Sequence, residues 1–129
     1  MINADICIIG GGAAGTAAAI KAKETAPDAV ICIIEKEPRL LKKVERTGNG
    51  RCNISNTNCE SHREVEEFFN SIGVVFDVEE DGRAYPYNRK SSSVVSALTK
   101  ALEGTDIITG CLVKGMKPLG GRFIIETDK

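Results

Sequence analysis

The chain is poor in the residues that build metal centres, disulfide frameworks and membrane segments. It has one histidine, His62, which cannot form a metal site by itself, and we expect it to be a solvated residue in the first turn of a helix. None of its five cysteines forms a C-x-x-C pair, and no apolar run approaches the length of a membrane span. The formal net charge of -1 gives no electrostatic reason to expect nucleic acid or an anionic membrane as a partner.

Other absences limit the cellular compartments and the kinds of catalytic site that the sequence favours. An odd number of cysteines, with no disulfide-like framework and no signal peptide, favours the reducing cytoplasm. No pair of side chains has the pattern of a catalytic acid and base, so no catalytic residue is predicted. The 129 residues, 42% hydrophobic and 27% charged, are expected to fold as a single domain, 1–129, with a hydrophobic core of its own.

The most informative feature that is present is a glycine-rich turn between an apolar run, 6–9, and a stretch typical of a helix. Its G-x-G-x-x-G spacing gives each glycine a mechanical role in binding the diphosphate of a dinucleotide. Gly10 allows the tight turn, Gly12 lets the diphosphate approach the backbone, and Gly15 lets the helix lie against the strand. The start of the helix would present N–H groups and a positive dipole end to the phosphates. The predicted diphosphate site consists of the small residues of this turn: Gly10, Gly12, Ala13, Ala14 and Gly15.

An acidic residue follows at the distance that this motif requires. Glu35 comes twenty residues after Gly15 and ends a second apolar run, 30–34. A carboxylate there can accept hydrogen bonds from the ribose hydroxyls of adenosine, and its charge disfavours the 2′-phosphate of NADP. The alternative is a tight strand-to-helix turn with Glu35 as a solvated strand end. We prefer the dinucleotide site because the strand, the helix, the second strand and the acid occur in register.

The wider pattern predicts a mixed α/β fold. Strands at 4–9 and 30–35 flank a helix at 13–25, which makes a βαβ unit with parallel, central strands. Beyond a long loop, Ser61 and Glu64 match a capping box at the start of another helix. The further predicted elements are a helix at 61–71 with a buried stripe of Val65, Phe68, Phe69 and Ile72, a strand at 74–78, a helix at 92–102, a strand at 107–108 and a hairpin at 111–127. The expected fold is α/β: a Rossmann-like domain with a parallel sheet and a C-terminal antiparallel hairpin annex.

A second motif, Thr47-Gly48-Asn49-Gly50-Arg51-Cys52-Asn53-Ile54-Ser55-Asn56, lies in the long loop. Its glycines let the backbone fold around a ligand, and Arg51 can donate to a phosphate or to a flavin carbonyl. Asn53 and Asn56 can bond a ribityl chain, or they can hold the loop through side chain-to-backbone hydrogen bonds. From spacing alone, a ligand-binding loop and a plain surface loop with Asx turns are equally good interpretations.

Four features of the chain together resemble the BaiN-like flavoproteins, also called the aminoacetone-oxidase family, of the glutathione-reductase-like group. They are the segment IIGGGAAG, the strand-ending Glu35, the segment TGNGRCNISN and the segment Gly82-Arg83-Ala84-Tyr85-Pro86. The resemblance implies FAD as the cofactor and allows NAD(P)H as a co-substrate. The residues that it assigns to the cofactor, besides the glycine turn, are Glu35, Lys36, Lys43, Thr47, Gly50, Arg51 and Asn53. A small-molecule cofactor is the one partner predicted, and no oligomeric state follows from the sequence.

The same resemblance implies a parent protein that is a flavin-dependent oxidoreductase. Its members are several times longer than this chain, and the elements that complete their flavin site would follow Thr127. We therefore expect an FAD-binding domain that holds the diphosphate and the adenosine ribose. The alternatives are a truncated or reduced nucleotide-binding module without turnover, and an interaction domain that has lost its ligand. We interpret Tyr85 as a packed aromatic and Cys52 as an inert loop thiol rather than as flavin-facing groups.

Overall fold

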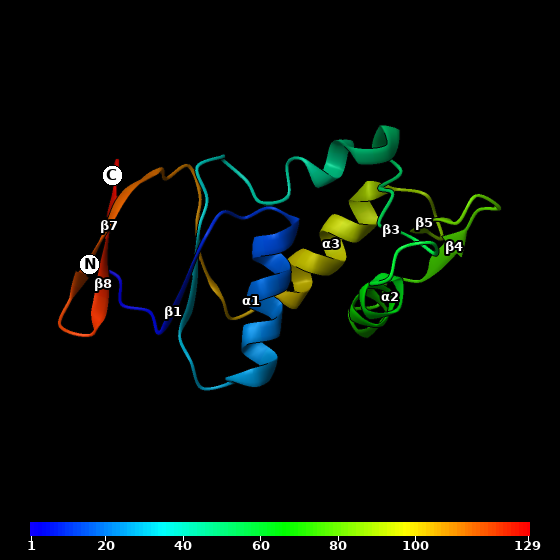
Figure 1. The fold of residues 1–129 in the computed structure, drawn as a ribbon. Helices are drawn as coiled ribbons and strands as arrows, with labels where there is room; N and C mark the ends of the chain where they lie inside the picture. The colour runs from blue at the N-terminus through cyan, green and yellow to red at the C-terminus, as the bar shows by residue number, and fades with distance from the viewer. The chain divides into compact units, whose positions relative to one another are not determined.

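A computed structural model describes all the residues, 1–129, and divides them into two compact units (Figure 1). Unit 1 comprises residues 1–41 and 104–129, and unit 2 comprises residues 42–103. Unit 1 is therefore built from both ends of the chain, and unit 2 is the continuous segment between them.

Unit 1 is organised around a parallel sheet. Its elements are β1 (Ile6–Ile9), α1 (Ala13–Thr25), β2 (Ile31–Ile34), β6 (Asp106–Ile108), β7 (Val113–Leu119) and β8 (Arg122–Thr127). The strands pair in parallel in the order β1-β2-β6, and every residue of β2 is buried, as is typical of a strand covered on both faces. The predicted βαβ unit is confirmed. The prediction of two central strands is wrong for β1, which lies at the sheet edge because β6 pairs with β2 on its other side.

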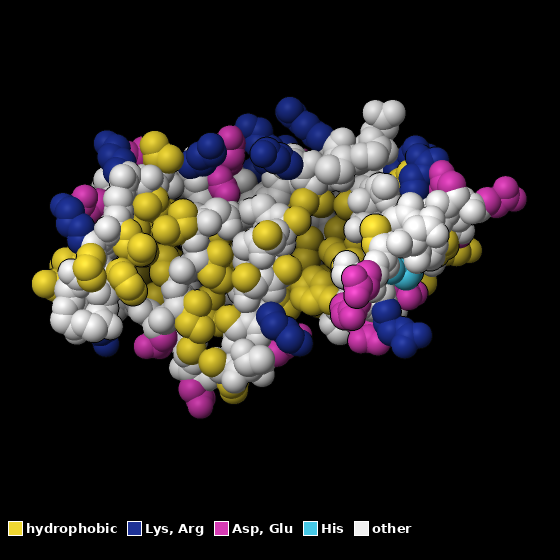
Figure 2. Space-filling model, viewed as in Figure 1, with side chains coloured by type: hydrophobic (Ala, Val, Ile, Leu, Met, Phe, Trp, Pro, Cys, Tyr) yellow, Lys and Arg dark blue, Asp and Glu magenta, His cyan; other side chains and the backbone are white.

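The C-terminal part of unit 1 is the predicted antiparallel hairpin. β7 and β8 are joined at Gly120 and Gly121, whose positive φ angles of 55° and 78° suit the tight turn of a two-residue hairpin. Val113 of β7 and Ile125 of β8 pack against a buried cluster that includes Cys32 and Cys111. On the face shown in Figure 2, apolar side chains gather over β1 and the hairpin. No helix of the chain has the length and apolarity needed to cross a membrane.

Unit 2 contains a small antiparallel sheet, of which the sequence pattern predicted one strand, at 74–78. Its elements are η1 (Val44–Gly50), β3 (Ser55–Asn56), α2 (His62–Ser71), β4 (Phe76–Val78), β5 (Arg83–Pro86) and α3 (Ser91–Ala101). The strand order is β3-β5-β4, with β5 in the centre and Tyr85 only 1% exposed. The two strands that were not predicted, β3 and β5, have too few residues for the alternation of apolar and polar side chains to be recognised. The helix predicted at 92–102 is α3, in which Val94 and Leu98 are buried.

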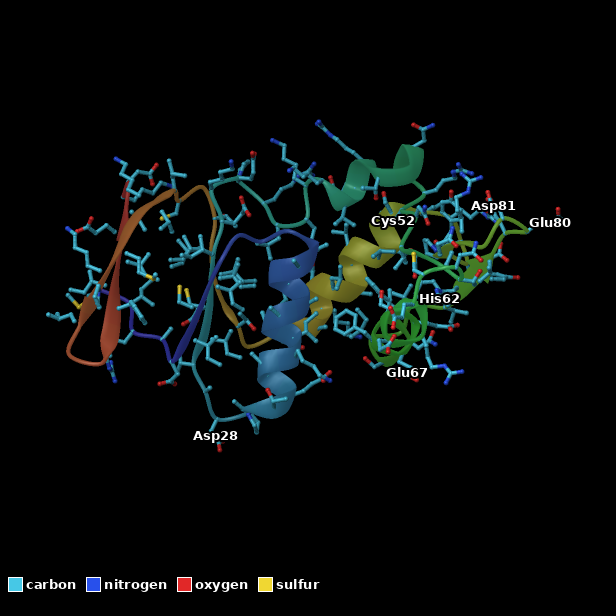
Figure 3. All side chains as sticks on the ribbon, viewed as in Figure 1. Asp28, Cys52, His62, Glu67, Glu80 and Asp81 are labelled. Atoms are coloured by element: carbon cyan, nitrogen blue, oxygen red, sulfur yellow. The ribbon has the colours of Figure 1, made fainter.

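The start of α2 differs from its prediction. Ser61 is the N-cap, but its backbone has φ -84° and ψ 10° instead of extended angles, and its side chain makes no cap hydrogen bond. The predicted capping box is therefore not formed. The predicted buried stripe is only half-buried, since α2 has no fully buried residue. The helix packs through its aromatic side chains, and the ring centroids of Phe69 and Phe76 are 6.0 Å apart. His62 is also half-buried rather than solvated, because its Nδ1 lies 3.0 Å from Ser55 Oγ (Figure 3).

Candidate functional site

The glycine turn of unit 1 has the strand-to-helix geometry that its spacing predicts. Gly10 has a φ of +105°, which a residue with a side chain rarely adopts, and its N–H donates to Ile34 O at 2.8 Å. A Cβ on Gly15 would lie 1.9 Å from Gly10 O, so α1 can approach β1 this closely only with glycine at that position. The mechanical roles expected for Gly10 and Gly15 are confirmed.

The start of α1 is open to solvent. Gly12 is the N-cap, no side chain caps the helix, and the first turn carries no acidic residue. A Cβ placed on Gly12 would meet no atom within 4 Å, and Gly12, Ala13 and Ala14 are all exposed. The first backbone hydrogen bond of the helix comes from Thr16 N to Gly12 O, so the N–H groups before Thr16 point to the free end. Free space, unpaired donors and a positive dipole end together fit an anionic group such as a diphosphate.

Glu35 lies beside this turn, not at a solvated strand end. Its side chain is buried, its Oε2 accepts from Gly11 N at 2.6 Å, and its Oε1 accepts from Glu37 N at 2.7 Å. These two backbone donors fix the orientation of the carboxylate. Each carboxylate oxygen has a second lone pair, so the group keeps the capacity to accept from the hydroxyls of a ribose. The next residue, Lys36, is exposed and belongs to the same unit.

The G-x-G-x-x-G motif assigns no role to Gly11, the middle glycine of the turn. A Cβ there would lie 2.2 Å from Leu40 Cδ2 and 3.2 Å from Glu35 Cβ, and Gly11 O accepts from Leu41 N at 2.8 Å. Gly11 therefore lets the turn, the acid and the chain after β2 pack against one another. The signal that could have revealed it is the third consecutive glycine, since the motif requires only two of the three.

In unit 2, the second motif forms a compact loop with several left-handed residues. The helical turns of η1 are interrupted at Thr47, Gly48 and Asn49. Positive φ angles occur at Gly48 (56°), Asn49 (53°), Gly50 (79°) and Cys52 (58°). The long loop expected to be irregular is thus ordered by short turns, with Cys52 N donating to Thr47 O at 3.0 Å.

The predicted site residues of unit 2 have different surroundings within that loop. Lys43 and Thr47 are exposed, and Thr47 Oγ1 donates to Val44 O at 2.8 Å. The Asn53 amide, oriented to satisfy its neighbours, donates to Ser55 O at 2.9 Å and to Ala84 O at 3.2 Å. The amide nitrogen therefore serves the loop itself, which favours the loop-holding alternative for that atom. Gly50 has open space around its Cα, with no atom within 4 Å of an added Cβ.

Arg51 is the loop residue best placed to meet a ligand. Its side chain is exposed, and its Nε donates to Gly48 O at 3.2 Å. Its guanidinium carbon lies 5.0 Å from the centroid of the buried Tyr85 ring, within the range of a cation–π contact. The Nη groups carry no hydrogen bond to the protein, so they remain available to acceptor oxygens.

A second arginine, which the sequence analysis did not single out, contacts the same ring. The guanidinium carbon of Arg89 lies 5.2 Å from the Tyr85 centroid, and its Nη atoms donate to Glu79 and Asp77. The hydrogen bonds to Glu79 and Asp77 raise the pKa of Arg89 above its ordinary value. No local pattern marks this residue, because its partners lie ten and twelve positions away in the chain.

Cys52 and Tyr85 have the structural roles expected for them. Cys52, labelled in Figure 3, lies between η1 and β3. It is buried, and burial raises the pKa of its thiol, although a weaker effect of a hydrogen bond with Thr47 lowers it. A protonated, buried thiol is a poor nucleophile. No cluster of three or more His, Cys, Asp or Glu side chains is arranged to hold a metal ion.

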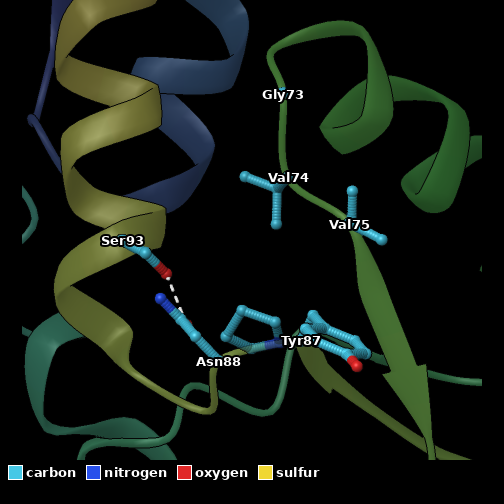
Figure 4. A pocket seen from close by; sticks show the side chains of 7 residues that line it. Gly73, Val74, Val75, Tyr87, Asn88 and Ser93 are labelled. Carbon is cyan, nitrogen blue, oxygen red and sulfur yellow. Dashed lines mark hydrogen bonds between the residues drawn. The ribbon is translucent and has the colours of Figure 1, made fainter.

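Unit 2 also has a small hollow that contains none of the predicted site residues. It has a volume of about 220 Å³ and is lined by Gly73, Val74, Val75, Pro86, Tyr87, Asn88 and Ser93 (Figure 4). Two polar side chains of the hollow are hydrogen-bonded to each other, since Ser93 Oγ donates to Asn88 Oδ1 at 3.0 Å. The hollow offers apolar contact but no free, buried polar group to orient a ligand.

Comparisons with known proteins agree on the class of the chain. Residues 1–119 match the family model for the alanine dehydrogenase/PNT C-terminal domain. A 3-dehydro-bile acid delta(4,6)-reductase of Clostridium scindens is 33% identical over 144 aligned positions, which cover 95% of this chain and 35% of that protein. The chain therefore spans about a third of the length of that curated relative.

Solved structures share the fold at lower sequence identity. THI4 of Thermovibrio ammonificans superposes with a TM-score of 0.71 at 16% identity, over 95% of this chain and 45% of that one. The bacillithiol disulfide reductase Bdr (YpdA) of Staphylococcus aureus gives a TM-score of 0.57 at 18% identity, over 100% of this chain and 35% of that one. The α/β, Rossmann-like fold class is thereby confirmed. Taken with the open glycine turn and its acid, the match over residues 1–119 shows that the chain belongs to the alanine dehydrogenase/PNT C-terminal domain family and is a nucleotide-binding domain similar to those of oxidoreductases.

Proposed function

We propose that this chain is the FAD-binding domain of a flavin-dependent oxidoreductase and that unit 1 holds the diphosphate and adenosine ribose of the cofactor. The observation that carries the proposal is the open start of α1, where Gly12 has free space above its Cα beside a buried, fixed Glu35 carboxylate. In this proposal the N–H groups of Ala13, Ala14 and Gly15 bind the diphosphate, and Glu35, accompanied by Lys36, binds the ribose.

The second motif, in unit 2, supplies the remaining residues of the proposal. One segment of unit 2 contains the residues Lys43, Thr47, Gly50, Arg51 and Asn53. The Nη groups of Arg51 are free to donate to a phosphate or to a flavin carbonyl. The resemblance of this loop to that of the BaiN-like flavoproteins favours a flavin over a nicotinamide dinucleotide, with NAD(P)H as a co-substrate. FAD supplies hydride exchange when bound, and the residues of this chain bind and orient it.

The activity of the whole protein is part of the proposal, since the chain spans about a third of its curated relative. That relative is by name a 3-dehydro-bile acid delta(4,6)-reductase, which suggests reduction of a conjugated steroid-like substrate by the parent protein. A cytoplasmic location fits the five free cysteines. The alternative, a nucleotide-binding module without turnover, would bind the same cofactor.

Absorbance after incubation with FAD and removal of free ligand tests the cofactor proposal. We expect bands at about 370 and about 450 nm with about one flavin per chain. NADH and NADPH, measured by equilibrium dialysis, should bind more weakly than FAD, and NADPH the weakest because Glu35 repels its 2′-phosphate. A chain that remains colourless and retains NADH instead would overturn FAD as the ligand.

A further inference from the structure

Arg89 has a backbone conformation that its side chain alone does not explain. Its φ is +52°, in the left-handed region where residues other than glycine are strained. Its N–H donates to Pro86 O at 2.7 Å, which closes a turn between β5 and α3. Such strain persists when the surrounding contacts fix the residue, and it is concentrated at functional sites.

The contacts of Arg89 hold its guanidinium in one place. Nη1 donates to Glu79 and Nη2 donates to Asp77, so both carboxylates fix the same planar group. One positive charge is thereby matched by two negative charges. A guanidinium held in this way can support the Tyr85 ring, 5.2 Å away, without adding uncompensated positive charge beside Arg51.

Arg51 is held much less firmly than Arg89. Its side chain makes one long hydrogen bond, from Nε to Gly48 O at 3.2 Å, and the contact with the Tyr85 ring. The loop around it depends on left-handed residues and not on a regular ladder of hydrogen bonds. The direction in which the Nη groups of Arg51 point therefore depends on where the Tyr85 ring lies.

From this arrangement we infer that Arg89 is a positioning residue. Anchored by Asp77 and Glu79, it fixes the Tyr85 ring, and the ring in turn orients Arg51 toward an acceptor oxygen of the bound dinucleotide. The inference rests on the proposed function for its ligand. It adds to that function a residue that forms no hydrogen bond with the second motif.

A double-mutant cycle with Arg89→Lys and Arg51→Gln tests the inference. Lysine keeps the charge but loses the planar fork and its contact with the ring. We expect Arg89→Lys to weaken FAD binding about tenfold in the presence of Arg51, and less than about twofold when Arg51 is already Gln. Equal losses in both backgrounds would overturn the inference, because a merely structural role acts regardless of Arg51. Arg63→Lys is the matched control, since Arg63 also lies in unit 2, is exposed on α2 and is not in contact with the Tyr85 ring or with either anchor of Arg89.

An NMR measurement on the unliganded chain separates this inference from the proposed function. Arg89→Lys should move the Arg51 Nε–Hε resonance toward its value in an unfolded peptide, because the ring no longer shields it. An unchanged resonance would contradict positioning even if FAD binds. If no variant binds FAD but the resonance moves, the proposed ligand fails while the coupling of Arg89 to Arg51 stands.

Two further measurements complete the design. Glu79→Gln frees one of the two anchors of Arg89 without removing it, so it should move the Arg51 resonance in the same direction by less. This variant keeps the inference testable if Arg89→Lys does not fold. Binding of ADP in the same cycle distinguishes the acceptor: coupling with ADP indicates a phosphate oxygen, and coupling with FAD alone indicates a flavin carbonyl.

Discussion

Glycine has different structural roles in the glycine turn of unit 1 and in the glycine-rich loop of unit 2. In the turn, the missing Cβ provides space for neighbouring protein atoms at Gly11 and Gly15, and at Gly12 it leaves open the space in which we propose that the diphosphate binds. In the loop, Gly48 and Gly50 provide left-handed backbone angles, and the space above Gly50 is empty. A glycine therefore has a role that is defined by what lies above its Cα and by its φ.

The largest effects should come from one valine substitution at each of two glycines of the turn. Gly15→Val forces a side chain against Gly10 O, so we expect the free energy of unfolding to fall by about 3 kcal/mol or more. Gly12→Val meets open space at a φ of -81°, so it should cost less than about 1 kcal/mol, yet it should weaken FAD binding about 100-fold or more. Urea unfolding and flavin titration measure the two effects. Unchanged FAD affinity in Gly12→Val would exclude this turn as the diphosphate site.

Glu35→Gln should have the next largest effect. The amide replaces one of two carboxylate acceptors, so either Gly11 N or Glu37 N loses its partner, and we expect a loss of about 2 kcal/mol of stability. The control is Glu24→Gln, because Glu24 forms an exposed pair with Lys21 and should change stability by less than about 0.5 kcal/mol. Equal effects in the two variants, measured by urea unfolding, would show that the Glu35 contacts do not hold the turn.

Two alanine substitutions test whether the loop of unit 2 depends on backbone angles. Gly50→Ala places a Cβ in open space at a φ of +79°, so its cost should be the left-handed strain alone, about 1 kcal/mol. Gly48→Ala adds a close contact with Asn53 N at 3.0 Å, so it should cost about 2 kcal/mol. Thermal unfolding would contradict this account if the two substitutions had no effect.

The smallest effect should be on the pH dependence of stability. Burial raises the pKa of Cys32 from its ordinary value of 9.0 to about 11. The folded chain thus keeps this proton between those pH values while the unfolded chain releases it, so stability is full below pH 9 and falls as the pH rises toward 11. In Cys32→Ala, the free energy of unfolding, measured with urea, should fall less steeply between pH 9 and pH 11. At neutral pH a thiol reagent should modify the exposed Cys59 well before Cys32.

The local patterns predicted the parts of the molecule in which neighbours in sequence are neighbours in space. α1 has the predicted bounds, because the glycine turn starts it and Pro27 follows its end. The hairpin of β7 and β8 also follows from its turn residues. The predictions of strand ends and helix caps were less accurate, since β2 is shorter than expected and the Ser61 capping box does not form.

The contacts between distant segments could not be predicted from one sequence. Arg89 meets Asp77 and Glu79 because β4 pairs with β5, and the sequence pattern predicted a strand at 74–78 but neither β5 nor its pairing. Gly11 meets Leu40 because the chain turns back after β2. The position of β1 at the sheet edge likewise depends on where β6 pairs, which no residue of β1 encodes.

By itself the sequence determined the nucleotide-binding turn, its acid and the α/β class, because the G-x-G-x-x-G spacing and Glu35 express local steric and electrostatic needs. The tertiary structure alone decided that Glu35 is buried and held by Gly11 and Glu37, and that Arg51 lies over the Tyr85 ring. The physical reason is that backbone conformation is set within a few residues, whereas burial and ring contacts depend on which distant strands pair.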